Sequence, residues 1–171
     1  MTAAKAQHPA RLLVVFQPHR YTRTQQQLGN FGAALAEADE VVLTDIYSAG
    51  EDPIPGVTVD ALAAAVRAGG QPAVRVIRSL SDVPAHVVAT AKSGDLVVML
   101  GAGSAGIGVY DMLRAQMVAD GVPDDEARGR FFVVDKIGMV TADRSDLSAE
   151  QRAYAHPADA LAGWTRTADG P

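Results

Sequence analysis

The sequence predicts a doubly wound α/β fold, with helices on both faces of a mainly parallel sheet. Short apolar runs recur at nearly regular intervals along the 171 residues, and segments with helical spacing of apolar residues lie between them. The runs are apolar at consecutive positions and rich in β-branched residues, as strands buried on both faces are. Strands that alternate with helices form parallel sheets through right-handed crossovers. We therefore expect one Rossmann-like domain with three layers, α/β/α.

Five strands are expected, and they follow the apolar runs at residues 11–16, 40–47, 73–77, 95–100 and 129–135. The helices between them are expected at residues 24–38, 58–70, 79–94 and 103–121. Thr24 is expected as an N-cap, a glycine as the C-cap of the second helix, and Pro84 in the first turn of the third. After the last strand the periodicity fades, although residues 148–151 form a capping-box pattern, and residues 158–171 are expected as a tail.

Composition excludes several classes of function. The apolar content of 48% is enough for a proper core, and the net charge of −5 argues against a general nucleic-acid-binding protein, because phosphate neutralisation needs a basic face. No apolar run is long enough to span a bilayer, and the N-terminus lacks the apolar core of a signal peptide, so a cytoplasmic protein is expected. The sequence contains no cysteine and no metal-ligand spacing among its four histidines, so no metal site is expected.

A polar segment, "FQPHRYTRT" at residues 16–24, follows the first strand. It places His19, Arg20 and Arg23 between a strand end and a helix start, where ligands of doubly wound sheets bind. Helix N-termini favour anions, and guanidinium groups bind carboxylate or phosphate in a fork. The segment is either a solvated loop or a site for a small anion, and its concentration of hydrogen-bonding residues favours the anion site.

Three motifs occur in order: "VVFQPHRYTRT", "DEVVLTDIYSAGEDPIPG" and "GDLVVMLGAG". Through them residues 11–103 resemble the C-terminal domain of the bacterial Mur ligases, ATP-dependent enzymes of peptidoglycan synthesis. The resemblance implies a domain that helps to place the amino acid and the acyl-phosphate, as in ligation of L-alanine to UDP-N-acetylmuramate. It implies that one substrate cleft is lined by His19, Arg20, Arg23, Asp45 and Tyr47, with the rest of the "DIYSAGE" loop, Ala49, Gly50 and Glu51.

The ligases also use a central domain with a phosphate loop and magnesium ligands, and a separate domain for the uridine nucleotide. This sequence carries neither pattern. ATP is therefore expected as a cofactor only together with such a central domain, and autonomous ligation is not expected.

A glycine pattern, "GAGSAG", joins the fourth expected strand to the next helix. Gly101, Gly103 and Gly106 match G-x-G-x-x-G, in which glycines let the backbone approach a pyrophosphate. The run "FFVVD" then places Asp135 at the end of a strand, where a carboxylate accepts ribose hydroxyls. The alternative is a packing turn between strand and helix without a ligand.

Residues 97–157, with "LGAGSAGIGVYDML" and "RFFVVDKIGMVTADRSDLSAEQRAYAH", resemble the NAD-binding domain of malic enzymes, which oxidatively decarboxylate malate. The resemblance implies that a dinucleotide is held by Gly101, Gly103, Ser104, Ala105, Gly106, Ile107 and Asp135. A carboxylate at Asp135 favours NAD over NADP, because it repels a 2′-phosphate. The catalytic tyrosine, lysine and acidic metal ligands of that family have no counterpart here, so no catalytic residue is assigned.

The segment "GDLVVMLGAG" fits both resemblances, which predicts a chimera-like chain joined there. Two hypotheses follow. The chain is a binding domain without turnover, with a small anion or a dinucleotide as ligand, or it is a fragment of a ligase or of a malic enzyme. A single α/β protein with one accidental resemblance is the simpler alternative. A sheet edge left unpaired at the join would allow a homodimer.

Overall fold

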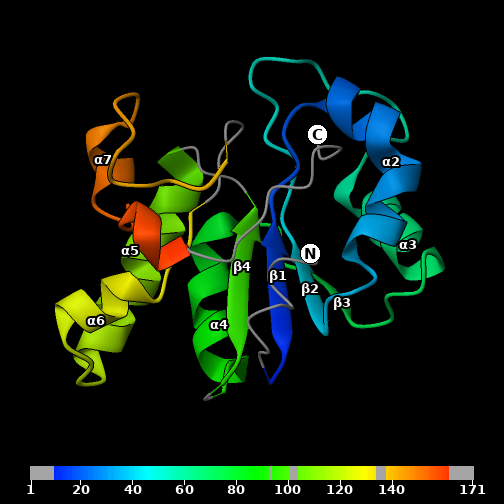
Figure 1. Ribbon diagram of the computed structural model, residues 1–171. Coiled ribbons are helices and arrows are strands. Elements are labelled where there is room, and N and C mark those ends of the chain that lie inside the picture. The colour runs from blue at the N-terminus through cyan, green and yellow to red at the C-terminus, as the bar shows by residue number, and fades with distance from the viewer. Residues whose placement is uncertain (1–9, 93, 101–103, 134–137, 162–171) are drawn as a thin grey trace. The chain divides into compact units, whose positions relative to one another are not determined.

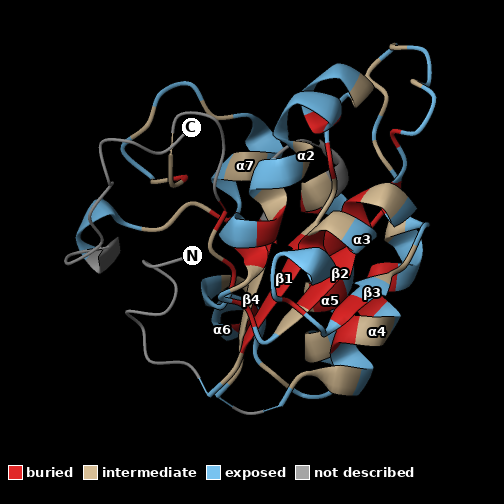
Figure 2. Ribbon diagram, turned by 90° about the vertical axis from the view of Figure 1, so that its right-hand side faces the viewer, coloured by how far each residue is buried: buried red, intermediate tan, exposed pale blue. Residues whose placement is uncertain are grey.

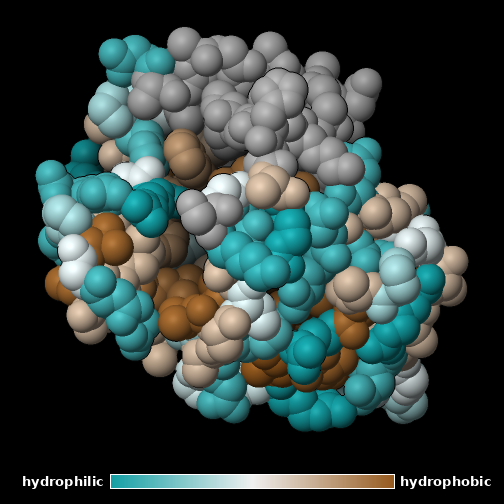
Figure 3. Space-filling view, turned by 90° about the horizontal axis from the view of Figure 1, so that it is seen from below, coloured by the Kyte–Doolittle hydropathy of each residue, from teal (hydrophilic) through white to brown (hydrophobic). Residues whose placement is uncertain are grey.

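A computed structural model describes residues 10–92, 94–100, 104–133 and 138–161. The chain divides into two compact units, Met1–Val98 and Met99–Pro171, and each is described by itself. Among the described residues, no helix is long and apolar enough to cross a membrane. The surface seen in Figure 3 is largely hydrophilic, and smaller hydrophobic patches interrupt it.

The first unit is built on a parallel sheet with the order β3-β2-β1-β4. Its strands are β1 (Leu12–Phe16), β2 (Glu40–Leu43), β3 (Val74–Val76) and β4 (Leu96–Leu100), the last of which begins in this unit and ends beyond its boundary at Val98. Val14 lies opposite Val41, and Val42 lies opposite Arg75, both in parallel register. These strands confirm the α/β Rossmann-like fold and four of the five expected strands.

The helices of this unit lie on both faces of the sheet. They are α2 (Tyr21–Leu35), α3 (Val59–Ala68) and α4 (Val83–Thr90), and the 3₁₀ helix η1 (Leu80–Asp82) leads into α4. The chain moves across the sheet in one direction from β1 to β3, so right-handed crossovers place α2 and α3 on one face. The return from β3 to β4 places α4 on the other face (Figure 1).

The core of the first unit lies on the central strands and the inner face of α3 (Figure 2). Val14, Val41 and Leu43 are fully buried in the sheet, and Leu62 and Val66 are fully buried on α3. Consecutive burial along β1 and β2 is the physical reason for their unbroken apolar sequence.

Two glycines let α2 approach α3 closely. A Cβ atom added to Gly69, the C-cap of α3, would lie 2.5 Å from the Cα atom of Gly32 on α2. Real Cβ atoms do not come so close, so larger residues at either position would push the two helices apart.

A charged pair ties the start of β1 to the start of β4. Arg11 donates from Nε and Nη2 to the two carboxylate oxygens of Asp95, at 3.2 and 2.5 Å, and its Nη2 also donates to the Thr90 carbonyl at 2.8 Å. The Asp95 side chain is only 2% exposed, and the hydrogen bond from Arg11 lowers the pKa of its carboxyl group. Burial opposes this shift but does not outweigh it.

The second unit contains α5 (Ser104–Ala119), α6 (Asp124–Gly129), α7 (Ala149–Arg152) and the 3₁₀ helix η2 (Ala158–Leu161). Its described core includes a cluster of three rings, Tyr110, Phe131 and Tyr154, whose centroids lie 5.3 to 5.7 Å apart. Tyr154 donates to the Asp111 carboxylate at 2.5 Å. Burial, followed by this hydrogen bond, raises the pKa of Tyr154 to about 12.

The prediction of a fifth strand at residues 129–135 is wrong for the residues of this range that the structure describes. Gly129 ends α6, and residues 131–133 belong to no strand. Phe131 instead packs into the ring cluster, and the Val133 carbonyl accepts a hydrogen bond from the Val140 amide at 2.8 Å. The local apolar sequence is compatible with a strand and with an irregular segment packed on α5, and packing against α5 selected the irregular segment.

The expected N-cap at Thr24 is also wrong, because α2 begins at Tyr21. Thr24 lies inside the helix, and its hydroxyl donates back to the Arg20 carbonyl at 2.7 Å. Pro84 does lie in the first turn of α4, and Ser148 and Gln151 do form the expected capping box.

Candidate functional site

The loops after β1 and β2 meet at the carboxyl edge of the first unit's sheet. His19 and Tyr47 form a parallel bridge, and their ring centroids are 5.4 Å apart. The Arg20 amide donates to the Tyr47 carbonyl at 2.8 Å, and the Tyr47 amide donates to the Pro18 carbonyl at 2.9 Å. Three residues predicted for one cleft, His19, Arg20 and Tyr47, are therefore held side by side by backbone hydrogen bonds.

The two predicted arginines stand at the start of α2. Arg20 is the N-cap residue and has a φ of 68°, in the left-handed region that non-glycine residues rarely adopt. Arg23 follows three residues later, and both side chains are exposed. Within the described part of the chain, neither guanidinium makes a hydrogen bond or a salt bridge, although the charge of Arg20 attracts that of Glu51.

The start of α2 is capped from a distance by Glu51. Its carboxylate accepts from the Thr22 amide at 3.0 Å and from the Thr22 hydroxyl at 2.7 Å. These bonds, that of the amide first, lower the pKa of the Glu51 carboxyl group. The resemblance placed Glu51 in the cleft loop, but sequence reasoning gave it no structural role, because its partner lies 29 residues away.

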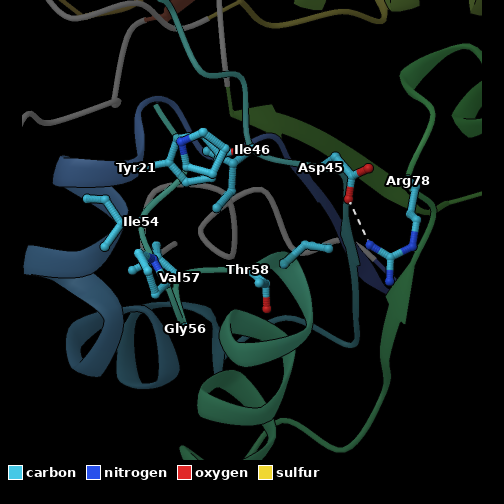
Figure 4. Close-up of a pocket in the computed structure, with 11 residues that line it drawn as sticks. Tyr21, Asp45, Ile46, Ile54, Gly56, Val57, Thr58 and Arg78 are labelled. Carbon is cyan, nitrogen blue, oxygen red and sulfur yellow. Dashed lines mark hydrogen bonds and ion pairs between the residues drawn. The ribbon is translucent and has the colours of Figure 1, made fainter. Parts of the chain in front are cut away.

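A cavity of about 590 Å³ opens beside these loops. It is lined by Tyr21, Asp45, Ile46, Pro53, Ile54, Pro55, Gly56, Val57, Thr58, Val59 and Arg78. In Figure 4 the ring of Tyr21 lies beside Ile46, and at the other end Asp45 points toward Arg78. The cavity thus has an apolar end and a charged end.

Arg78 joins two carboxylates at the charged end. It donates to Asp45 at 3.1 Å and to Asp60, in the first turn of α3, at 2.7 Å. These bonds, that to Asp60 first, raise the pKa of Arg78. Asp45 therefore faces this cavity and pairs with Arg78, while His19, Arg20 and Tyr47 form a separate group. Sequence reasoning missed Arg78, although it directly follows an expected strand and the strand-end rule would have found it.

Only part of the predicted dinucleotide site can be described. Gly101, Gly103 and Asp135 lie outside the described residues. Helix α5 begins at Ser104, so Ser104, Ala105 and Gly106 form its first turn. The Ile107 side chain is 3% exposed and belongs to the core of the second unit.

The described residues contain no group of three or more His, Cys, Asp or Glu side chains that could hold a metal ion.

A four-stranded parallel sheet with helices on both faces and cationic side chains at its strand ends defines a Rossmann-like α/β domain. Two family models match the chain. The model of the Mur ligase glutamate ligase domain matches residues 1–103, and the model of the malic enzyme NAD-binding domain matches residues 57–169. The chain therefore belongs to the Mur ligase family and, through an overlapping part, to the malic enzyme NAD-binding family.

Several similar proteins are named UDP-N-acetylmuramate–L-alanine ligase. That of Geotalea daltonii is 47% identical over 104 residues, covering 61% of this chain and 23% of the relative. That of Acidothermus cellulolyticus is 55% identical over 93 residues, covering 54% of the chain and 19% of the relative. That of Acidithiobacillus ferrooxidans is 50% identical over 105 residues, covering 61% of this chain and 22% of the relative. The chain thus spans about a quarter or less of these relatives.

Proposed function

We propose that the first unit is an anion-binding domain of the ligase type, which orients a carboxylate or phosphate group during UDP-N-acetylmuramate–L-alanine ligation. The observation that carries this proposal is the pair Arg20 and Arg23, exposed and without partners among the described residues at the start of α2. Relatives that carry the ligase name at 47% to 55% identity support the substrate class.

The chemistry suits binding rather than turnover. A guanidinium group offers donors in a planar fork that matches carboxylate and phosphate oxygens, and it stays charged at all relevant pH values. Because neither Arg20 nor Arg23 makes a hydrogen bond or a salt bridge within the described structure, a ligand has no such bond to break. The bridge between His19 and Tyr47 fixes the backbone beside them. We assign these residues the tasks of binding and orienting, and the ligation itself to the nucleotide-bearing part of a ligase.

Calorimetric titration with inorganic phosphate and with UDP-N-acetylmuramate tests this proposal. The double change Arg20→Ala with Arg23→Ala should weaken binding of either ligand by tenfold or more, since each charge-assisted contact contributes more than about 1 kcal/mol. Arg75→Ala is the matched control, because Arg75 is an exposed arginine on β3 of the same unit. Equal affinity for the double variant and for the control would refute the anion site.

The match to the malic enzyme NAD-binding domain supports a second candidate function. It covers residues 57–169 and includes a strand, β4, that is followed by the glycine sequence and by α5. The chain would then be a hybrid, joined at the segment common to both families, whose C-terminal part binds a dinucleotide without decarboxylating malate. The alternative is a fragment of an NAD-dependent malic enzyme.

Thermal unfolding with NAD and with NADP tests the second candidate. NAD at 100 times its dissociation constant should stabilise the protein by about 2.7 kcal/mol, and Gly103→Asp should abolish this effect. Gly108→Asp provides the control, because Gly108 lies further along α5 and an added Cβ would meet nothing within 4 Å. A cooperative transition that neither nucleotide shifts would assign the glycine turn to the fold alone.

A further inference from the structure

The loop after β2 is fastened to the start of α2 at two places. Tyr47 makes the two backbone bonds described above, and Glu51 holds Thr22 through both of its carboxylate oxygens. Arg20 lies between these fastenings, because its amide donates to Tyr47 and Thr22 is only two residues further on. Glu51 therefore acts on the short segment that also carries the guanidinium groups of Arg20 and Arg23.

Two residues in this arrangement have unusual backbone conformations. Arg20 has a φ of 68° and Ala49 a φ of 51°, and they are the two non-glycine residues with positive φ in the described chain. Ala49 and Gly50, whose φ is 86°, are the central residues of a turn closed by the bond from the Glu51 amide to the Ser48 carbonyl, at 3.0 Å. That turn directs the Glu51 side chain back toward α2. Such conformations persist only where surrounding contacts hold them.

The Arg20 side chain makes no capping hydrogen bond to its own helix, and the Thr24 hydroxyl is engaged by the Arg20 carbonyl. The Thr22 amide is one of the orphan donors of the helix N-terminus, and Glu51 satisfies it. The Glu51 carboxylate, whose charge interacts with that of Arg20, also has an electrostatic cost for ligand binding, since it repels an incoming anion. The two effects of Glu51 on anion affinity therefore have opposite signs.

We infer that Glu51 is a positioning residue, which holds Arg20 and Tyr47 in the geometry that binds an anion, and that this positioning outweighs its repulsion of the anion. The inference rests on the proposed anion-binding function. Glu51 bonds to Thr22 and its charge attracts Arg20, so we assign its influence to the loop, the helix start and the Arg20 side chain.

The sign of the effect on phosphate affinity tests the inference. If Glu51 acted only through charge, Glu51→Ala and Glu51→Gln would both tighten phosphate binding. Positioning predicts that Glu51→Ala weakens it by about tenfold, the loss expected when a charge-assisted hydrogen bond that fixes a site is removed. Glu51→Gln retains an oxygen that accepts from Thr22 and loses the repulsive charge, so it should bind phosphate at least as tightly as the unchanged protein.

Two further variants complete the binding test. Thr22→Val removes the hydroxyl donor from the other side and should weaken phosphate binding in the same direction as Glu51→Ala. Combined with Glu51→Ala it should add little, because both changes break one interaction. Asp52→Asn removes a neighbouring exposed charge and should not weaken binding. Tighter phosphate binding by Glu51→Ala would overturn the inference.

Amide hydrogen exchange separates this inference from the proposed function. Glu51→Ala should speed the exchange of the Arg20 and Tyr47 amides by about tenfold, because local opening becomes easier when the fastening is lost. Unchanged exchange would refute positioning, whatever the protein binds. Suppose instead that Glu51→Ala speeds exchange but the unchanged protein binds no phosphate. This result would refute the anion-binding function and the predicted effect on affinity, while the role of Glu51 in holding the loop would stand.

Discussion

The close approach of α2 and α3 gives a prediction whose size follows from the structure. In Gly32→Ala, the added Cβ would lie 2.9 Å from the Ala65 carbonyl oxygen and 3.1 Å from the Gly69 Cα atom. Both are backbone atoms, so relief requires the helices to move apart. Gly29→Ala is a matched change on the same helix, because nothing lies within 4 Å of its added Cβ.

The two substitutions share one favourable effect and differ in one cost. Replacing glycine by alanine inside a helix stabilises it by about 1 kcal/mol. Overpacking at a tight contact costs about 1 to 3 kcal/mol. Gly29→Ala should therefore raise the free energy of unfolding by about 1 kcal/mol. Gly32→Ala should change it by between about zero and −2 kcal/mol, so that the variants differ by about 1 to 3 kcal/mol.

Urea unfolding followed by far-ultraviolet circular dichroism measures this difference. The denaturant dependence should be the same for both variants, since neither changes the surface exposed on unfolding by much. Gly32→Ala with a stability equal to or greater than that of Gly29→Ala would show that the two helices are not in backbone contact at this point, and would refute the packing described here.

Three further predictions concern stability. Asp95→Asn should lower the free energy of unfolding at neutral pH, and this deficit should shrink as the pH falls below about 4. The reason is that Arg11 lowers the pKa of the Asp95 carboxyl group, so the charged carboxylate stabilises the fold and its protonation removes that contribution. A deficit that is constant with pH contradicts this. Tyr154 has a pKa raised to about 12, so the unchanged protein should lose stability relative to Tyr154→Phe as the pH rises from about 10 to 12, measured by alkaline unfolding with tyrosine absorbance. Below that window the lost bond to Asp111 should make Tyr154→Phe the less stable protein. Leu62→Ala, at a fully buried position, should cost about 2 to 5 kcal/mol in thermal unfolding, and a cost under 1 kcal/mol would exclude Leu62 from the core.

Much of the fold could be predicted from the sequence, because strand and helix periodicity are local properties. The runs that became β1, β2, β3 and β4 were identified within a few residues, and the parallel order followed from their alternation with helices. The strand-end rule pointed to His19 and Arg20, and the family resemblance added Tyr47; the structure brings these three residues together.

The prediction failed where an apolar or polar pattern fits more than one local structure. The run "FFVV" is suited to a strand, but Phe131 packs against the rings of both Tyr110 and Tyr154. Thr24 is a suitable N-cap residue, yet α2 starts three residues earlier, where Glu51 supplies the cap from another loop. In both places the deciding partner is distant in sequence, so no local pattern could reveal it.

The sequence by itself therefore determined the fold class, the order of the elements and the strand ends at which a site can form. Only the tertiary structure decided the partners: Glu51 with Thr22, Arg78 with Asp45 and Asp60, and Gly32 with Gly69. The physical reason is that backbone periodicity and turn chemistry act over a few residues, whereas hydrogen-bond partners, ion pairs and close helix contacts are selected by packing between segments that only the folded chain brings together.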